Sequence, residues 1–298
     1  MQPPECILLK KFVKELWKRD LTCPEPCNPR SYPSYFEKSQ PQGCFTAHTL
    51  LCLLELILLK TEIAGILVRS DIEWSELVTA VLLHDIGKLT SNYIKEKYSK
   101  HNVLSAVITY TLLRGKNVDY ENIVKLCQAI LLHHEYRHWS ELFREELVHI
   151  ASTIEKPKGG RIRMASGYVD ALGKLKFVAQ ELRLIGEEQV DLLDSLLYKR
   201  EIVFPREFKV YIAGYWGTPT LQAVKMYWFL QLVDNRAASC REGLKNYWLI
   251  QFKSISEQVE AENLKSILLA DKILSQTRSP RILLSLIPAV AVMKELGI

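Results

Sequence analysis

Two apolar segments of this chain end on the same kind of polar pair. Val81–Leu83 is followed directly by His84–Asp85, and Ile130–Leu132 is followed directly by His133–His134. A polar pair at the end of a buried segment costs free energy unless another group binds it. Imidazole and carboxylate groups together suit first-row divalent cations. The pattern therefore predicts buried helices whose ends meet around a metal site.

Histidine is unevenly distributed along the chain, which strengthens this prediction. All seven histidines lie in the first half of the sequence: His48, His84, His101, His133, His134, His138 and His149. A single histidine on an apolar helix face is more often a structural residue than a ligand, and His149, in an amphipathic stretch, is interpreted as structural. The repeated placement of histidines at the ends of apolar segments favours metal binding by His48, His84, His101, His133 and His134.

Apolar residues recur at three- and four-residue steps along most of the chain, which predicts a mainly α-helical, all-α fold. Helices are expected at about 5–18, 46–60, 72–87, 102–113, 120–134, from 140 onward, and at 180–199, 220–238, 243–252, 256–276 and 281–296. Segment 22–43 is expected to be irregular, and segment 156–163 is expected to break the helical pattern. The stretch KVYIAGYW within 204–219 is the only strand-like material, so at most a short β-hairpin is predicted.

Composition excludes disordered, collagenous and membrane-spanning classes. The 298 residues are 48% hydrophobic and 24% charged, as in ordinary globular proteins. The net charge of +5 permits a phosphate-bearing partner without requiring one. Apolar stretches 50–59 and 282–292 are too short to span a membrane, and no signal peptide is recognised. We predict a single cytoplasmic domain, 1–298, whose seven cysteines are thiols rather than disulfides.

The motif His84–Lys88, HDIGK, resembles the HDxGK signature of the HD superfamily of metal-dependent phosphohydrolases. His48 stands where that family's first helix supplies a histidine. Residues 100–106, followed by His133–His134, are similar to the stand-alone CRISPR-associated HD nuclease subunit of type I interference systems. That branch ends its motifs with an aspartate closely followed by a serine, as residues 233–239 do here.

This resemblance covers about residues 44–240 and implies an HD-domain helical bundle as the nuclease core. An N-terminal helix and irregular segment, 1–43, and a C-terminal helical extension, 241–298, are expected around it. The implied activity is hydrolysis of DNA phosphodiester bonds with two divalent metal ions that clamp the attacking and leaving oxygens. The ions are left open among Mg²⁺, Mn²⁺, Fe²⁺, Co²⁺ and Ni²⁺.

The resemblance also implies which residues bind each of the two metal ions. One ion is assigned to His48, His84, Asp85 and Asp234, with Asp85 bridging, and the other to His101, His133 and His134. Asp170 competes with Asp234 as the closing carboxylate. Lys88 follows His84 by four residues and Asp85 by three, so it shares their helix face. We assign Lys88 to the scissile phosphate or the attacking water, where it would stabilise negative charge.

A basic stretch is the candidate contact with substrate. Its four positive residues are Lys156, Lys158, Arg161 and Arg163. They could follow a phosphate backbone, although charge runs are more commonly solvated surface. Four aromatic residues could stack on the bases of a single strand, although aromatics are more often core: Tyr136, Trp139, Tyr215 and Trp216. His138 could lie near the substrate as well.

The chain has no P-loop spacing around its Gly-Lys pairs, so it carries no recognisable ATP motor. The resemblance therefore implies that a separate CRISPR helicase subunit and an RNA-guided effector complex deliver single-stranded DNA to it. Two alternatives stay open. The chain could be an HD phosphohydrolase that acts on a small nucleotide or cyclic nucleotide. It could also be a catalytically inactive scaffold subunit, although the complete set of motif residues argues against this.

Overall fold

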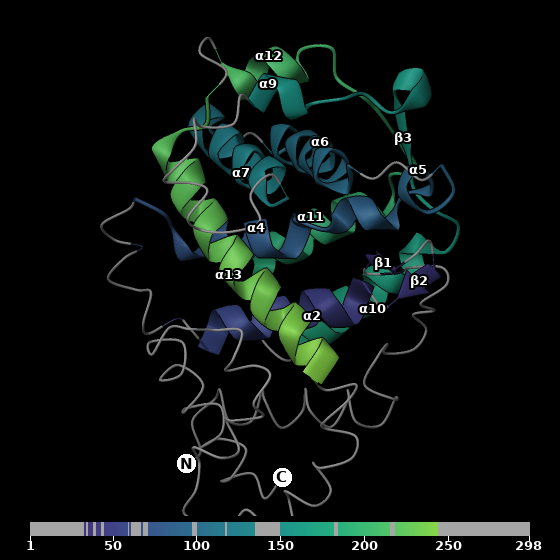
Figure 1. The fold of residues 1–298 in the computed structure, drawn as a ribbon, viewed down its shortest axis with the longest axis vertical. Helices are drawn as coiled ribbons and strands as arrows, with labels where there is room; N and C mark the ends of the chain where they lie inside the picture. Colours follow the sequence, from purple (N-terminus) through teal and green to yellow (C-terminus); the bar gives the residue numbers. More distant parts are fainter. Residues whose placement is uncertain are drawn as a thin grey trace, which may run out of the picture.

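A computed structural model describes most of the chain between residues 33 and 243. The described residues are 33, 35–37, 40–42, 45–58, 60, 67, 71–96, 100–116, 118–134, 150–181, 184–214 and 218–243. Helices dominate this part of the chain (Figure 1), so the prediction of a mainly α-helical fold is confirmed. The expected N-terminal helix, the helix from residue 140 and the C-terminal helices beyond residue 243 lie outside the described residues, as do Tyr136, His138, Trp139, His149, Tyr215 and Trp216.

The longer helices of the described part of the chain have ten or more residues. They are α2 (Phe45–Leu58), α4 (Trp74–Leu83), α6 (His101–Arg114), α7 (Tyr120–Leu132), α10 (Tyr168–Glu181), α11 (Glu187–Leu197) and α13 (Leu221–Gly243). Shorter helices are α5 (Ser91–Ile94), α9 (Ile150–Thr153), α12 (Phe208–Ala213) and the 3-10 helices η1 (Ile86–Leu89) and η2 (Lys158–Gly160). The expected helices near 46–60, 72–87, 102–113, 120–134 and 220–238 are all found, with ends shifted by a few residues.

Helices α6 and α7 form the centre of the bundle and pack side by side. Almost every residue of α6 is buried, including Asn102, Ser105 and Thr109. A helix that is buried on all sides belongs in the interior of a domain rather than on its surface. Asn102 Nδ2 donates a hydrogen bond of 2.7 Å to the carbonyl of Leu131, which fixes the start of α6 against the end of α7.

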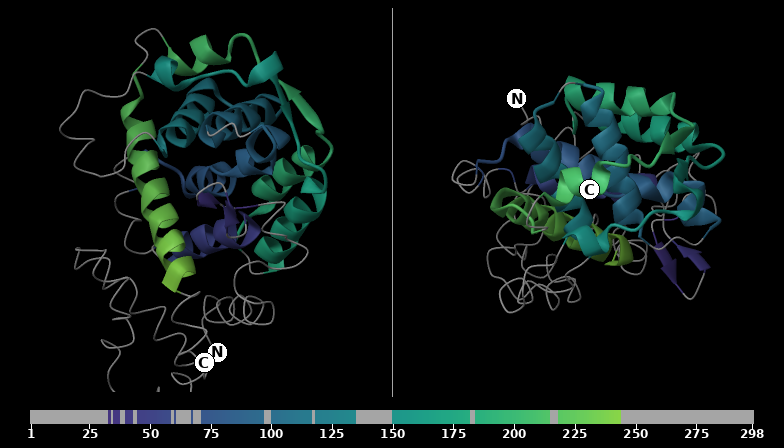
Figure 2. Two further views of the ribbon diagram at one scale, coloured as in Figure 1. Left: turned by 45° about the vertical axis from the view of Figure 1, so that its right-hand side comes forward. Right: turned by 90° about the horizontal axis from the view of Figure 1, so that it is seen from above.

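Helix α13 closes the bundle along one side (Figures 1 and 2), where it contacts α7, α2 and α4. Its buried residues Met226, Leu230, Val233 and Ala237 recur at three- and four-residue steps, the pattern of a helix with one face against a core. Through this packing, the part of α13 beyond residue 230 lies against α2, which begins at Phe45.

The turn after α4 packs unusually close to α6. A Cβ atom at Gly87, in η1, would lie 2.4 Å from the backbone oxygen of His101 and 2.8 Å from Cβ of Leu104. The Gly87 amide donates a hydrogen bond of 2.8 Å to Oγ of Ser105. Only glycine allows the backbone to approach this closely. The glycine in HDIGK therefore sets the distance between η1 and the start of α6.

The described strands form two small antiparallel sheets, where the sequence suggests at most one hairpin. Strands β1 (Tyr35–Glu37) and β2 (Gln40–Gln42) pair with each other, within the segment expected to be irregular. Strand β3 (Arg161–Arg163) pairs with β4 (Glu201–Val203), with Arg163 opposite Glu201.

Two local predictions are wrong. The strand-like stretch KVYIAGYW begins inside α12, because Phe208 and Ile212 lie one helical turn apart and both are buried, while Gly214 ends the helix with a φ of 63°. Helix α10 is missing from the sequence prediction, and the expected helix 180–199 is instead the end of α10 followed by α11, which begins after Gly186. In the described part of the chain, no helix has the length and apolar character needed to cross a membrane.

Candidate metal centre

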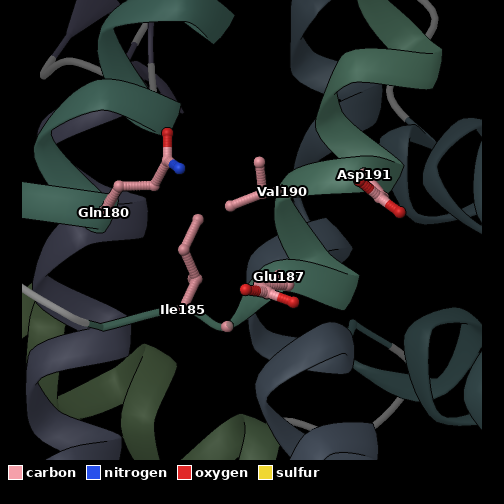
Figure 3. Close-up of a pocket in the computed structure, with 6 residues that line it drawn as sticks. Gln180, Ile185, Glu187, Val190 and Asp191 are labelled. Carbon is pink, nitrogen blue, oxygen red and sulfur yellow. The ribbon is translucent and has the colours of Figure 1, made fainter.

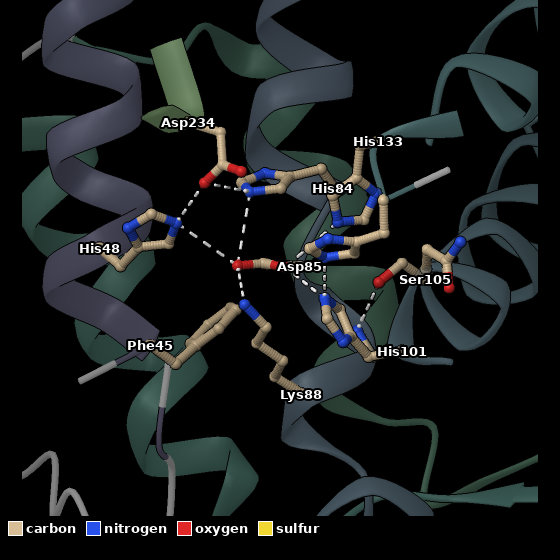
Figure 4. A network of polar contacts seen from close by, with 12 residues as sticks. Phe45, His48, His84, Asp85, Lys88, His101, Ser105, His133 and Asp234 are labelled. Carbon is tan, nitrogen blue, oxygen red and sulfur yellow. Dashed lines mark hydrogen bonds and ion pairs between the residues drawn. The ribbon is translucent and has the colours of Figure 1, made fainter. Parts of the chain in front are cut away.

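Seven histidine and aspartate side chains from five segments of the chain meet at one point (Figure 4). They are His48 in α2, His84 and Asp85 at the end of α4, His101 at the start of α6, His133 and His134 at the end of α7, and Asp234 in α13. These are the seven residues that the sequence predicts as metal ligands. The structure brings all of them together; their role as ligands is taken up as a proposal below.

The cluster divides into two groups of donor atoms. One group is His48, Cys52, His84 and Asp234, and the other is Asp85, His101, His133 and His134; within each group the donor atoms lie within 4.8 Å of one another. Asp234 Oδ1 lies 2.8 Å from Nε2 of His48 and 3.8 Å from Nε2 of His84. Asp170, the competing carboxylate, is exposed in the first turn of α10 and is in neither group.

Asp85 lies between the two groups and faces both. Its Oδ2 atom lies 3.5 Å from Nε2 of His48 and 3.4 Å from Nε2 of His84. Its Oδ1 atom lies 3.1 Å from Nε2 of His101 and 3.6 Å from Nε2 of His133. A carboxylate with one oxygen toward each set of imidazoles has the geometry of a bridging ligand.

His84 and His133 are oriented in the same way at the ends of two helices. The Nδ1 atom of His84 lies 2.7 Å from the carbonyl oxygen of Val81, and that of His133 lies 2.6 Å from the carbonyl oxygen of Ile130. Each carbonyl accepts the Nδ1 proton, so Nε2 is the ring nitrogen directed into the cluster, and it can offer its lone pair to a cation that displaces any proton there. Such a hydrogen bond to the outer ring nitrogen is the usual support of a metal-binding histidine.

The cluster contains buried polar atoms that the described protein groups leave without hydrogen bonds. Among the described residues these include Nε2 of His84, Nε2 of His133 and Oδ1 of Asp85. Leaving one such group unsatisfied costs about 1–3 kcal/mol. In addition, Nε2 of His134 lies only 2.7 Å from Nε2 of His101. A divalent cation in each group would satisfy these atoms at once, so the residues present fit a pair of metal ions.

The electrostatics keep both carboxylates charged. Burial tends to raise the pKa of Asp85, but Lys88 and His84 outweigh it and hold this pKa well below its usual value. Burial acts in the same direction on Asp234, but the hydrogen bond from His48 and the nearby ring of His84 hold its pKa well below its usual value. Burial tends to lower the pKa of His84, but the carboxylates of Asp85 and Asp234 raise it to about 10. The cluster thus holds two carboxylates ready to receive positive charge.

Lys88 supplies a positive charge at the edge of the cluster. Its Nζ atom lies 2.6 Å from Oδ2 of Asp85, and its side chain is buried.

Tyr93 contacts the cluster through His101. The two rings pack edge-on, with 5.2 Å between their centroids. Burial and the charge of Asp85 raise the pKa of Tyr93, so its hydroxyl stays protonated at neutral pH. Asp234, with 20% of its side chain exposed, and the exposed His134 are the members of the cluster that reach solvent.

The basic stretch is on the surface, as a substrate contact requires. Lys156, Lys158, Arg161 and Arg163 are all exposed. The two arginines share one acidic partner, because Arg161 lies 2.6 Å and Arg163 lies 3.2 Å from the carboxylate of Glu201 in β4. Strand β3, which carries these arginines, is joined to the segment that follows Lys88: Asn92 donates to the carbonyl of Arg161 and accepts from the amide of Arg163.

Sequence reasoning missed Cys52 and Tyr93. Cys52 follows His48 by four residues, a spacing that places two side chains on one helix face, and this signal was available in the sequence. Tyr93 gave no such signal, because its contact with His101 depends on the packing of α5 against η1.

A separate surface pocket of about 400 Å³ lies away from the metal cluster (Figure 3). The described residues that line it come from the end of α10 and the start of α11: Gln180, Ile185, Gly186, Glu187, Val190 and Asp191. None of the seven clustered residues is among them. The pocket combines two carboxylates, Glu187 and Asp191, with the apolar side chains of Ile185 and Val190.

Comparison with known proteins connects this cluster to a family. Residues 48–194 match the family model of the HD domain. The matched segment includes every member of the cluster except Asp234, which lies beyond its end. Searches of the curated proteins and of the solved structures found no match to the chain.

Proposed function

We propose that this chain is a two-metal nuclease that hydrolyses DNA, with a single strand as substrate, because residues 48–194 match the family model of the HD domain, which implies a metal-dependent phosphohydrolase. The observation that carries the proposal is the position of Asp85, with one carboxylate oxygen toward each group of imidazoles. A bridging carboxylate of this kind serves two adjacent ions rather than one.

The proposed ligands follow from the two groups. His48, His84 and Asp234 would hold the first ion, His101, His133 and His134 the second, and Asp85 both. When bound, the ions would supply Lewis-acid stabilisation of a phosphodiester and a nucleophilic water at neutral pH. The protein contributes the orientation of the donor atoms, since the carbonyls of Val81 and Ile130 fix the rings of His84 and His133.

Lys88 would stabilise the negative charge that develops on the phosphate. Its buried Nζ atom is held beside the cluster by Asp85 at 2.6 Å, so little reorganisation is needed when substrate arrives. A fixed charge in a site with restricted access to water contributes more than a mobile surface lysine. The ring of Tyr93 would position His101 through packing, and its hydroxyl would take no part in proton transfer.

The surface around β3 supports a polyanionic substrate. Four exposed positive residues stand there, and the carboxylate of Glu201 pairs with the two arginines among them. Ser91 Oγ and Asn92 Nδ2 bind the backbone of β3, and both residues come shortly after η1, the turn that contains Lys88. A nucleic acid strand could therefore contact the basic surface while one phosphate lies at the cluster. A small nucleotide would not need this surface.

The motif residues also support a place in CRISPR interference. HDIGK, residues 100–106 and residues 233–239 resemble the CRISPR-associated HD nucleases. We propose on this resemblance that a separate helicase subunit and an RNA-guided effector complex supply the single strand, in the cytoplasm.

The test is cleavage of a labelled single-stranded DNA oligonucleotide by the purified chain. The reactions contain EDTA, Mg²⁺, Mn²⁺, Co²⁺ or Ni²⁺, and compare the unmodified protein with Asp85→Ala and with Asp170→Asn, a matched control at an exposed carboxylate. The proposal expects metal-dependent cleavage that Asp85→Ala abolishes and Asp170→Asn keeps. Hydrolysis of nucleoside triphosphates or cyclic nucleotides without any DNA cleavage would favour the small-nucleotide alternative. A protein that neither binds metal nor cleaves any of these substrates would be the inactive scaffold.

A further inference from the structure

A cysteine lies inside the first group of donor atoms. Cys52 is fully buried in α2, and its Sγ atom lies 3.7 Å from Nε2 of His48. That same nitrogen lies 2.8 Å from Oδ1 of Asp234 and 3.5 Å from Oδ2 of Asp85. The thiol therefore faces the atom of His48 that is directed into the cluster, not the outer side of the ring.

The separation of sulfur and nitrogen matches shared coordination of one ion. In a tetrahedral zinc site, with Zn–S of about 2.3 Å and Zn–N of about 2.0–2.1 Å, the sulfur and nitrogen donors lie about 3.6 Å apart. The observed 3.7 Å is close to this value. Sγ also lies within 4.8 Å of the donor atoms of His84 and Asp234, so no ligand of this group is out of reach of a common centre.

We propose that Cys52 is a further ligand of the first metal ion, beside His48, His84, Asp234 and the bridging Asp85, and that it makes this group of donor atoms selective for a thiophilic ion such as Zn²⁺ or Co²⁺ over Mg²⁺. The inference rests on the proposed function only in requiring that the cluster binds metal. On coordination the thiol proton passes to solvent and the sulfur donates its electron pair to the ion. Thiolate ligands favour borderline and soft ions, whereas Mg²⁺ prefers oxygen.

The second group offers the contrast within the same molecule. Asp85, His101, His133 and His134 supply only nitrogen and oxygen donors. The two groups of donor atoms should therefore differ in metal preference, with the harder ion bound by the second group. The expected active form holds one thiophilic ion in the first group and an exchangeable ion in the second.

The test is titration of the metal-free full chain with Co²⁺, followed by absorption spectroscopy. Bound Co²⁺ gives visible ligand-field bands, and a cobalt–thiolate bond adds an intense near-ultraviolet charge-transfer band. Cys52→Ala and Cys52→Ser are compared with Cys127→Ala. Cys127 is the matched control: it is also fully buried, but in α7, where its thiol lies 3.5 Å from the carbonyl oxygen of Ala106 and in neither donor group.

The proposal expects a charge-transfer band in the unmodified chain and in Cys127→Ala, and its loss in both Cys52 variants while ligand-field bands from the second group remain. Those remaining bands also show that the variants are folded. Competition between Zn²⁺ and bound Co²⁺ should show that Cys52→Ala binds Zn²⁺ at least about tenfold more weakly than the unmodified chain, the lower end of what loss of a supporting group costs. The affinity for Mg²⁺ should be unchanged. Ligand-field bands without charge transfer, or a band that survives in Cys52→Ala, would overturn the inference and leave the proposed function standing. Absence of any cobalt spectrum would overturn both.

Discussion

Replacement of Gly87 by alanine should displace His101, a proposed metal ligand, while every proposed ligand side chain stays unchanged. The added Cβ atom would lie 2.4 Å from the backbone oxygen of His101, 2.8 Å from Cβ of Leu104 and 2.9 Å from the amide nitrogen of Ser105. Contacts of a real Cβ atom below 3.0 Å are essentially never found. Because two of these neighbours are backbone atoms of one helix, a side-chain rotation cannot relieve the clash. Helix α6 and η1 must move apart.

The size of the effect follows from this overlap. Overpacking of a well-packed interior costs about 1–3 kcal/mol, and loss of the Gly87–Ser105 hydrogen bond adds about 0.5–1.5 kcal/mol. Nε2 of His101 lies 3.1 Å from Oδ1 of Asp85, so separation of η1 from α6 stretches this contact directly. A misplacement of about 1 Å in a catalytic site can cost about 100-fold in rate. We therefore expect a less stable protein with metal affinity and cleavage reduced by about 10- to 100-fold.

Urea denaturation and Co²⁺ titration of the purified variant measure the two effects separately. Gly173→Ala is the control, because Gly173 lies inside α10 and the structure describes no atom within 4 Å of its added Cβ. That variant should be stabilised by about 0.5–1 kcal/mol, the difference between alanine and glycine in a helix. A Gly87→Ala protein as stable as the unmodified chain, with normal metal affinity, would refute the argument that this close approach positions His101.

Three further predictions test other parts of the structure. Asp234→Asn should weaken binding of the first metal ion far more than Asp170→Asn in a calorimetric titration; the reverse result would move the closing ligand to α10. Lys125→Met should lower the free energy of unfolding by about 3–5 kcal/mol in urea, because it leaves Glu76, 2.7 Å from Nζ of Lys125, as a buried unpaired charge. Addition of Glu76→Gln should restore most of this stability, and a double variant as unstable as the single one would contradict the explanation. The double substitution of Arg161 and Arg163 by alanine should weaken single-stranded DNA binding. It should also make the slope of log affinity against log salt concentration shallower by about 0.7 for each phosphate that is no longer neutralised, whereas Glu201→Gln should strengthen binding. Equal affinities in fluorescence anisotropy would exclude β3 from the binding surface.

The histidines and the aspartate at the ends of α4 and α7 could be predicted to meet because they stand at recognisable places in the sequence. His84 and His133 directly follow apolar runs, and a helix end in a helical bundle delivers its last side chains to a shared point. Asp234 is named by the resemblance of residues 233–239 to a known motif and by the apolar run 228–233 that it follows, but neither signal shows its contact with His48, 186 residues away. Periodicity within one segment contains no information about which helices become neighbours.

Cys52 shows the limit of reading residues one at a time. A cysteine in an apolar helix is normally a small core residue, and only the four-residue spacing from His48 sets Cys52 apart from one. Helix α12 was misread for a related reason: six residues contain fewer than two helical turns, so the pattern of buried positions fits a strand as well as a helix. In both cases tertiary packing decides what the local sequence leaves open.

The arrangement of the cluster argues that metal binding and folding depend on each other. Asp85 and Asp234 bring two negative charges into a site where Lys88 is the neighbouring ammonium group, and Nε2 of His84 and of His133 are buried without hydrogen bonds among the described groups. Hydrophobic packing of α2, α4, α7 and α13 holds these groups together at a cost, because unsatisfied buried polar atoms destabilise the folded state. Cations that bind only the assembled cluster recover that cost and stabilise the fold in proportion to their affinity. Because Asp234 lies on α13, at the partly exposed edge of the site, ions bound there would also hold this helix against α2.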